Sequence, residues 1–259
     1  MKYGVCCGPD MAATVAAAGF DYFEGTVAGV LQPRESEDAF TKFLVAVRTA
    51  GLPCAAVNCF VPGDLKITGP TADLAALEAY VRTACTRGQQ VGVQTIVFGS
   101  GGARRIPDGF DPAAAHRQIV AFCRMLGPVA QAHGITIAVE PLNRAECNVL
   151  TSVRESAELV REVGHPHVRL LVDAYHFLKD SDSLADVVAA GPLLVHAHVA
   201  TLSSRLPPGA EPCDFAPFFK ALLHGGFHGR MSIESNLPNP AESLPRALAL
   251  LKRLERDSR

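Results

Sequence analysis

The sequence predicts a single α/β domain, residues 1–259, in which eight parallel strands alternate with helices and close into a (β/α)₈ barrel, the TIM barrel. Short apolar runs alternate eight times with longer segments of helical periodicity, and this alternation is typical of a parallel sheet. Eight such units in 259 residues fit a closed barrel. An open doubly wound sheet is the competing fold. It requires a glycine fingerprint after the first strand, and Gly8-Pro9-Asp10 does not provide one.

The first four strand–helix units follow from local patterns. In the second unit Ser36 caps a helix in which Phe40, Leu44 and Val47 recur at helical spacing, and Gly51 closes it. A glycine-rich segment, residues 99–102, follows the fourth strand and is interpreted as a mouth loop. Strands are predicted at residues 2–7, 21–24, 54–60 and 94–98, and helices at 11–18, between 36 and 51, at 71–90 and at 111–133.

The second half shows the same alternation more clearly. Its strands are predicted at residues 135–140, 168–173, 193–198 and 231–234, and its helices at 152–163, 183–190, 215–224 and 241–256. The two proline-rich segments, 207–209 and 237–240, directly follow predicted strands. They are therefore interpreted as loops at the barrel mouth, and no linker divides the chain.

Composition excludes several classes of protein. With 48% hydrophobic residues and a net charge of −2, the chain is neither intrinsically disordered nor a basic nucleic-acid binder. No apolar run approaches the roughly 18–20 residues of a membrane span. The N-terminal residues lead straight into the first strand rather than forming a signal peptide, and the eight cysteines show no CxxC spacing. We therefore expect reduced thiols and a cytoplasmic protein.

Four consecutive predicted strands end in residues that ligate metals. These residues are Glu140, Asp173, His198 and Glu234. In a barrel the carboxyl ends of the strands meet at one rim, so three carboxylates and an imidazole are expected together. Like charges at close range repel, and a divalent cation relieves that repulsion. Oxygen-rich ligation with one imidazole suits Mn²⁺, Mg²⁺ or Co²⁺.

Two further histidines lie near this rim. His196 precedes His198 by two residues and shares its face of the strand, one layer deeper, where a hydrogen-bonded structural role is expected. His176 lies three residues past Asp173, in the segment predicted as the loop after the sixth strand. That position suits a contact with the substrate or with the ligands.

Four motifs of the second half resemble the xylose isomerase-like TIM-barrel superfamily. They are Glu-Pro-Leu-Asn-Arg-Ala-Glu at 140–146, Asp-Ala-Tyr-His at 173–176, His-Ala-His at 196–198 and Ser-Ile-Glu at 232–234. Within the sugar phosphate isomerase/epimerase group they are most similar to the D-tagatose and D-psicose (allulose) 3-epimerases. The alternation of strands and helices extends the similarity over the whole chain.

This resemblance implies a metal-dependent sugar epimerase. It implies one divalent cation, with Mn²⁺ expected before Mg²⁺ or Co²⁺, held by the four rim residues. It also implies that Glu140 and Glu234 flank C3 of a ketose and exchange its proton through a cis-enediolate. Glu146, His176 and Arg205 match the family positions that contact the substrate. The expected partner is a small sugar or polyol; a homo-oligomer stays open.

Alternatives on the same barrel remain at this stage. They are an aldose–ketose or hydroxypyruvate isomerase, and a lyase or dehydratase acting on an inositol derivative or a 3-keto-glycoside. An apurinic endonuclease-like protein is disfavoured, because the chain has one ligand set and no basic face. The chain also departs from the family pattern, with Glu211 at the second glycine of the Arg-x-x-Pro-Gly-x-Gly loop. That loop, which carries Arg205, is expected to differ in shape.

The sequence also bears on phosphorylated substrates. Arg104 and Arg105, with Lys66 and Arg144, are the candidate phosphate ligands. Glu146, if it lines the pocket, repels a phosphate. We therefore expect an unphosphorylated ketose or another neutral polyol.

Overall fold

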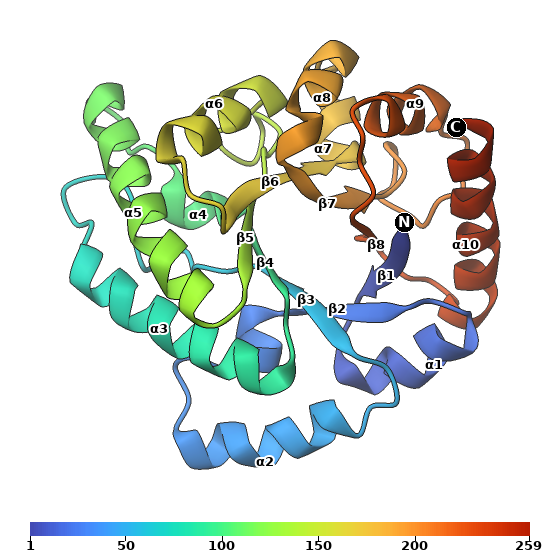
Figure 1. The fold of residues 1–259 in the computed structure, drawn as a ribbon, viewed down its shortest axis with the longest axis horizontal. Coiled ribbons are helices and arrows are strands. Elements are labelled where there is room, and N and C mark those ends of the chain that lie inside the picture. The colour runs from blue at the N-terminus through green and yellow to red at the C-terminus, as the bar shows by residue number, and fades with distance from the viewer.

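The computed structural model describes residues 1–259 and shows a closed barrel of eight parallel strands (Figure 1). Each strand pairs with the next one in sequence, and β8 closes the barrel against β1. The strands are β1 (Lys2–Cys6), β2 (Tyr22–Thr26), β3 (Cys54–Asn58), β4 (Thr95–Phe98), β5 (Thr136–Val139), β6 (Val168–Asp173), β7 (Leu194–Val199) and β8 (Arg230–Ile233). The predicted (β/α)₈ fold class is confirmed.

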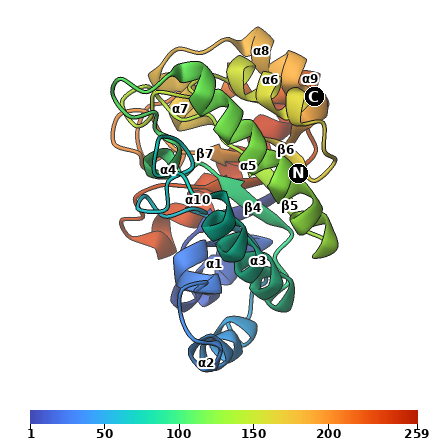
Figure 2. The ribbon, with the colours of Figure 1, turned by 90° about the vertical axis from the view of Figure 1, so that its left-hand side faces the viewer.

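Helices form a layer around the outside of the barrel (Figure 1), and α3 and α5 lie side by side on it (Figure 2). The helices of the chain are α1 (Ala12–Ala17), α2 (Glu37–Arg48), α3 (Leu74–Val91), α4 (Gly101–Arg104), α5 (Pro112–Ala132), α6 (Val153–Val163), α7 (Ala174–Lys179), α8 (Leu184–Ala190), α9 (Ala216–His224) and α10 (Pro240–Asp257). None of these helices is both long and apolar enough to cross a membrane.

Local chemistry sets several helix ends. The side chains of Asp73, Asp111 and Ser152 accept hydrogen bonds from backbone N–H groups in the first turns of α3, α5 and α6. These bonds satisfy donors that have no partner within the helix. Gly92 and Gly164 end α3 and α6 at φ values of 94° and 65°, a conformation that glycine adopts without strain.

Apolar strand residues pack on both faces of the sheet. One cluster of 63 buried residues joins the barrel to its helices. In the sequence, parallel strands covered on both faces are continuous apolar runs, and this pattern made the strands predictable. The polar exceptions on these strands are therefore informative.

Strand register brings the rim residues to one level. Asp173 of β6 lies opposite His198 of β7. Glu140 and Glu234 follow directly after β5 and β8, and their backbone N–H groups donate to Phe98 O at 3.1 Å and to Val199 O at 3.2 Å. The neighbouring strands thus hold both glutamates in place.

Three short helical segments that follow β2, β4 and β6 were not predicted. They are a π-helical turn (Val27–Leu31) directly after β2, α4 after β4, and α7 after β6. The interpretation of residues 99–102 as a plain mouth loop was therefore incomplete, and the placement of His176 in a loop was wrong. His176 lies in α7, which begins directly after Asp173 because the Asp173 side chain accepts a hydrogen bond from Tyr175 N and caps the helix. The second strand also runs two residues further than predicted.

Candidate metal centre and active site

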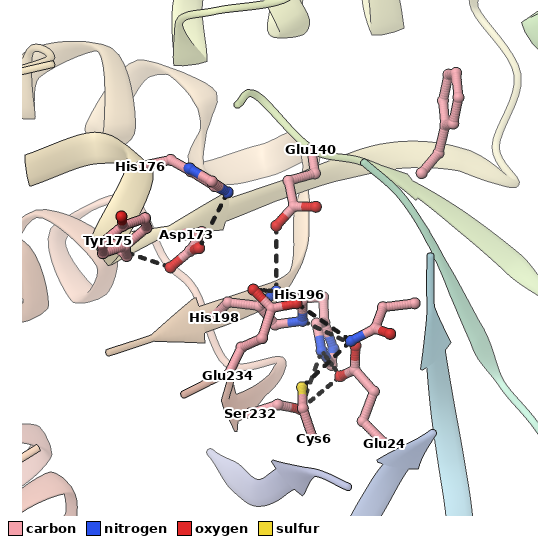
Figure 3. Close-up of polar contacts among 12 residues, drawn as sticks. Cys6, Glu24, Glu140, Asp173, Tyr175, His176, His196, His198, Ser232 and Glu234 are labelled. Carbon is pink, nitrogen blue, oxygen red and sulfur yellow. Dashed lines mark hydrogen bonds and ion pairs between the residues drawn. The ribbon is translucent and has the colours of Figure 1, made fainter. Parts of the chain in front are cut away.

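Glu140, Asp173, His198 and Glu234 meet at the carboxyl ends of β5 to β8. Figure 3 shows their side chains gathered around one point. One ligand atom from each lies within 4.8 Å of the others. The side chain of His198 is fully buried, and those of Glu140 and Asp173 are nearly so. The structure thus brings together all four of the residues predicted as metal ligands.

His198 presents its two ring nitrogens to different carboxylates. Its Nδ1 lies 3.2 Å from Glu140 Oε1 and 3.6 Å from Glu234 Oε2. Its Nε2 lies 2.9 Å from Oε1 of Glu24, a residue of β2. Nδ1 is therefore the nitrogen that faces the four-residue cluster.

Asp173 has one carboxylate oxygen without a hydrogen-bond partner. Its Oδ1 accepts from Tyr175 N at 2.9 Å, which caps α7. Its Oδ2 is buried and accepts no hydrogen bond. A buried oxygen of this kind calls for a partner, and a cation ligated by three carboxylates and an imidazole supplies one. The residues present therefore fit a divalent cation.

The four groups shift one another's protonation. Burial alone would raise the pKa of Glu140, but the hydrogen bond and the charge of His198 outweigh it and lower that pKa. Burial, together with the nearby carboxylates of Glu140 and Asp173, raises the pKa of Glu234 to about 8. Burial also raises the pKa of Asp173. Without a cation, the cluster reduces its repulsion by holding protons.

Arg205, predicted to contact the substrate, lies over the cluster. Its guanidinium donates to the Glu234 carboxylate and lies 3.8 Å from Asp173 Oδ2. It also stacks on the ring of Tyr175, with 4.5 Å between Cζ and the ring centroid. Arg205 thus reaches two rim carboxylates from a loop.

The loop that carries Arg205 has its own anchor. Glu211, which replaces a glycine of the family pattern, accepts hydrogen bonds from Thr201 Oγ1 and from Ser204 N. Arg205 itself adopts a positive φ of 50°. The carboxylate therefore ties the loop back to the end of β7.

His176 and Glu146 lie on the β5–β6 side of the cluster. His176 Nε2 is 3.5 Å from Asp173 Oδ2, and its Nδ1 is 2.7 Å from Asn143 Nδ2. The same amide group donates to Glu146 Oε1 at 2.8 Å. Asn143 therefore links the two predicted substrate residues, of which His176 is buried and Glu146 is partly exposed.

A cavity of about 320 Å³ opens beside Glu234 toward the first strands. It is lined by Cys6, Cys7, Gly8, Pro9, Glu24, Thr26, Gly29, Val30, Asn58, Cys59 and Glu234. Asn58 donates to Glu234 Oε1 at 3.3 Å, and its own Oδ1 is buried without a partner. No lysine or arginine is among the lining residues. The lining side chains are mostly small and uncharged, three of them are thiols, and the two charged ones are the carboxylates of Glu24 and Glu234.

The hypothesis that Arg104 binds a phosphate is wrong. Its side chain is fully buried and donates to backbone carbonyls, among them Phe98 O at 2.9 Å and Glu140 O at 2.7 Å. Arg105 donates to Glu146 O, and Lys66 donates to Gly102 O. These side chains tie the mouth loops together instead of lining the cavity. Arg144 is exposed and pairs with Asp180.

Sequence reasoning missed Glu24 as part of the site. Glu24 closes the predicted second strand, so the rule that found the other rim acids applied to it as well. Unlike the other rim acids, Glu24 lies in the first half of the chain, outside the four motifs.

Residues 12–254 match the model of the xylose isomerase-like TIM barrel family. The chain belongs to this family. It is 30% identical over 230 residues to an L-ribulose 3-epimerase of Methylomonas sp. (strain DH-1), which covers 86% of this chain and 76% of that protein. Members of the family therefore include sugar epimerases close to this chain.

Solved structures support the same relationship at the level of the fold. A D-psicose 3-epimerase crystallised in the presence of D-fructose superposes with a TM-score of 0.85 at 21% identity, over 98% of this chain and 99% of that one. A Methylomonas sp. D-allulose 3-epimerase in complex with D-allulose gives 0.83 at 24% identity, over 98% and 96%. The predicted family is confirmed, and the chain is an enzyme related to sugar epimerases.

Proposed function

We propose that this enzyme is a divalent-metal-dependent ketose 3-epimerase that acts on an unphosphorylated sugar. The observation that carries the proposal is the pair Glu140 and Glu234. The two glutamates come from β5 and β8, and both face His198 Nδ1, at 3.2 Å and 3.6 Å. Epimerisation inverts one carbon, so it needs a proton acceptor on one face and a proton donor on the other.

The environments of the two glutamates suit opposite roles. His198 lowers the pKa of Glu140, so this carboxylate is ionised and able to accept the C3 proton. In the cation-free protein the pKa of Glu234 is raised to about 8, so of the two glutamates it is the one that binds a proton more readily and suits delivery to the other face. Pairs of titratable groups whose pKa values are pushed apart are typical acid–base partners. The reverse reaction exchanges the roles.

A divalent cation bound at the rim would stabilise the negative charge that develops on substrate oxygen. Mn²⁺ is the cation we propose, with Glu140, Asp173, His198 and Glu234 as its ligands. Arg205 and His176, beside Asp173, would hold sugar hydroxyls, and Glu146 would accept a hydrogen bond from another. Arg205 is already paired with Glu234 and Asp173, and no lysine or arginine is among the residues that line the cavity, which suits a neutral substrate.

A product assay tests this proposal. The Mn²⁺-loaded enzyme is incubated with free ketoses and with their phosphates, and products are resolved by chromatography and NMR in D₂O. We expect a C3 epimer with deuterium at C3, from free ketoses only. An aldose product would instead indicate an isomerase, and loss of water or of an aglycone would indicate a lyase. A clear preference for phosphates would overturn the proposed substrate class.

A further inference from the structure

A second polar cluster lies inside the barrel, beneath the rim. Glu24 is only 1% exposed, and both of its carboxylate oxygens are occupied. Oε1 lies 2.9 Å from His198 Nε2. Oε2 lies 2.8 Å from His196 Nε2 and accepts from Ser232 Oγ at 2.6 Å (Figure 3). Three donors from β7 and β8 thus converge on one carboxylate of β2.

Burying this carboxylate inside the barrel costs free energy. A buried carboxylate loses its hydration and is tolerated only when hydrogen bonds or charges replace the water. Apolar residues fill the interior of a barrel at lower cost. The contacts among the four rim residues do not need Glu24. Glu24 contacts Nε2 of His198, whereas the rim carboxylate of Glu140 contacts Nδ1 on the opposite side of the ring.

We propose that Glu24 is a positioning residue that sets the tautomer and the orientation of His198 for the metal centre. Its Oε1 holds the proton of His198 on Nε2, and this leaves the Nδ1 lone pair directed at the space between Glu140 and Glu234. Carboxylates that accept from a ligating histidine fix its ring and raise its basicity. The inference rests on the proposed function, since it assigns Nδ1 to the cation.

The contacts of Glu24 Oε2 explain why His196 and Ser232 belong to the cluster. His196 and Ser232 hold Oε2, so the carboxylate cannot rotate away from His198. Tyr22 Oη lies 2.9 Å from Ser232 Oγ and extends the network without touching Glu24. The expected structural role of His196 thus becomes specific: it orients Glu24.

A competing interpretation makes Glu24 a ligand itself. Cys6, Glu24 and His198 each offer an atom within 4.8 Å of the others, which is a second possible donor set. The 2.9 Å contact occupies His198 Nε2, however, and one nitrogen cannot both donate to Glu24 and ligate a cation. The two interpretations differ in whether a thiol enters the coordination.

The test compares Glu24→Gln with Tyr22→Phe as the matched control. Both changes keep the shape of a buried side chain in the same network, but only the first removes the carboxylate. Mn²⁺ affinity is measured by calorimetric titration, and unfolding of the cation-free proteins by urea. We expect Glu24→Gln to weaken Mn²⁺ binding by about 10–100-fold and Tyr22→Phe to leave it unchanged. A merely structural role for Glu24 would lower the urea midpoint and leave the affinity unchanged, and that result would overturn the proposal.

A second measurement needs no variant of Glu24. In the Mg²⁺-loaded wild-type protein, two-bond ¹H–¹⁵N spectra should show the His198 proton on Nε2 and none on Nδ1; the opposite tautomer would overturn the assignment. With Co²⁺, a sulfur-to-metal charge-transfer band that disappears in Cys6→Ser would also overturn it. If wild-type protein bound no divalent cation, the proposed function would fail together with this inference, whereas unchanged affinity in Glu24→Gln would remove the positioning role alone.

Discussion

The two halves of the barrel contribute different chemistry to the same mouth. Strands β5 to β8 deliver Glu140, Asp173, His198 and Glu234, whose atoms lie close enough to share one cation. Strands β1 to β3 line the adjoining cavity mostly with thiols, small residues and the amide of Asn58. Under the proposed function the second half supplies proton transfer and metal binding, and the first half gives the cavity its shape. Glu24 is the exception, a first-half carboxylate whose Oε1 lies 2.9 Å from Nε2 of the second-half residue His198.

The strongest challenge to this division is removal of the proposed acid and base. Glu140→Gln and Glu234→Gln should each lower kcat by about 10²–10⁴-fold, because a positioned acid or base contributes that much. Both should abolish exchange of the substrate C3 proton with D₂O, followed by NMR. Circular dichroism should show an intact fold, since both residues lie at the mouth. Near-native turnover in Glu140→Gln would remove that residue from any acid–base role.

Substitution of Arg205 tests whether the loop after β7 takes part in the chemistry proposed for strands β5 to β8. Its guanidinium reaches Glu234 and Asp173, and charge-assisted hydrogen bonds are worth about 1.5–3 kcal/mol. We therefore expect Arg205→Ala to lower kcat/KM by about 10–100-fold in steady-state assays. Arg205→Lys serves as the control that keeps the charge. An unchanged kcat/KM in Arg205→Ala would contradict a role for Arg205 in the reaction.

The pH dependence of metal binding tests the electrostatics of the second half. Burial and the neighbouring carboxylates raise the pKa of Glu234 to about 8, and Glu24 and Glu234 raise the pKa of His198 against the effect of its burial. Protons held below these pKa values must leave when a cation binds. Mn²⁺ affinity should therefore fall as the pH falls from 8 to 6, by about tenfold per pH unit for each proton released. Calorimetric titrations at several pH values check this, and a pH-independent Kd would contradict it.

The same pKa shift predicts how the cation-free protein responds to pH. A carboxyl whose pKa is higher in the folded than in the unfolded chain binds more protons when folded. The contribution of Glu234 to stability is therefore present below the ordinary carboxylate range and is lost as the pH rises toward 8. Urea unfolding with and without Mn²⁺ should show stabilisation by the cation that grows with pH. A stabilisation that shrinks with pH would contradict the assignment.

The smallest effect is expected in the first half. Asn58 lines the cavity and donates to Glu234 Oε1, and its own Oδ1 is buried. A neutral hydrogen bond is worth about 0.5–1.5 kcal/mol, so Asn58→Ala should lower kcat/KM by about 2–10-fold, mainly through KM. Cys59→Ser, a change on the same cavity wall, is the control. A loss as large as that of Glu234→Gln would contradict the division between the halves.

Much of the fold and of the rim was predictable, because both depend on short-range pattern. Buried parallel strands are apolar runs, and a charged residue at the end of such a run stands out, as Glu140 and Asp173 do. The short helices α4 and α7 could not be predicted in the same way. A helix of four to six residues is marginal by itself and forms only where tertiary contacts complete it.

The sequence by itself therefore determined the eightfold alternation, the identity of the four rim residues and the family. The tertiary structure alone decided which nitrogen of His198 faces the rim and that Glu24 holds the other. It also decided that Arg104 is a buried donor to carbonyls and not a phosphate ligand. The physical reason is that pattern fixes which residues reach the barrel mouth or its interior. The direction in which each polar group there points depends on partners that lie up to 210 residues away along the chain.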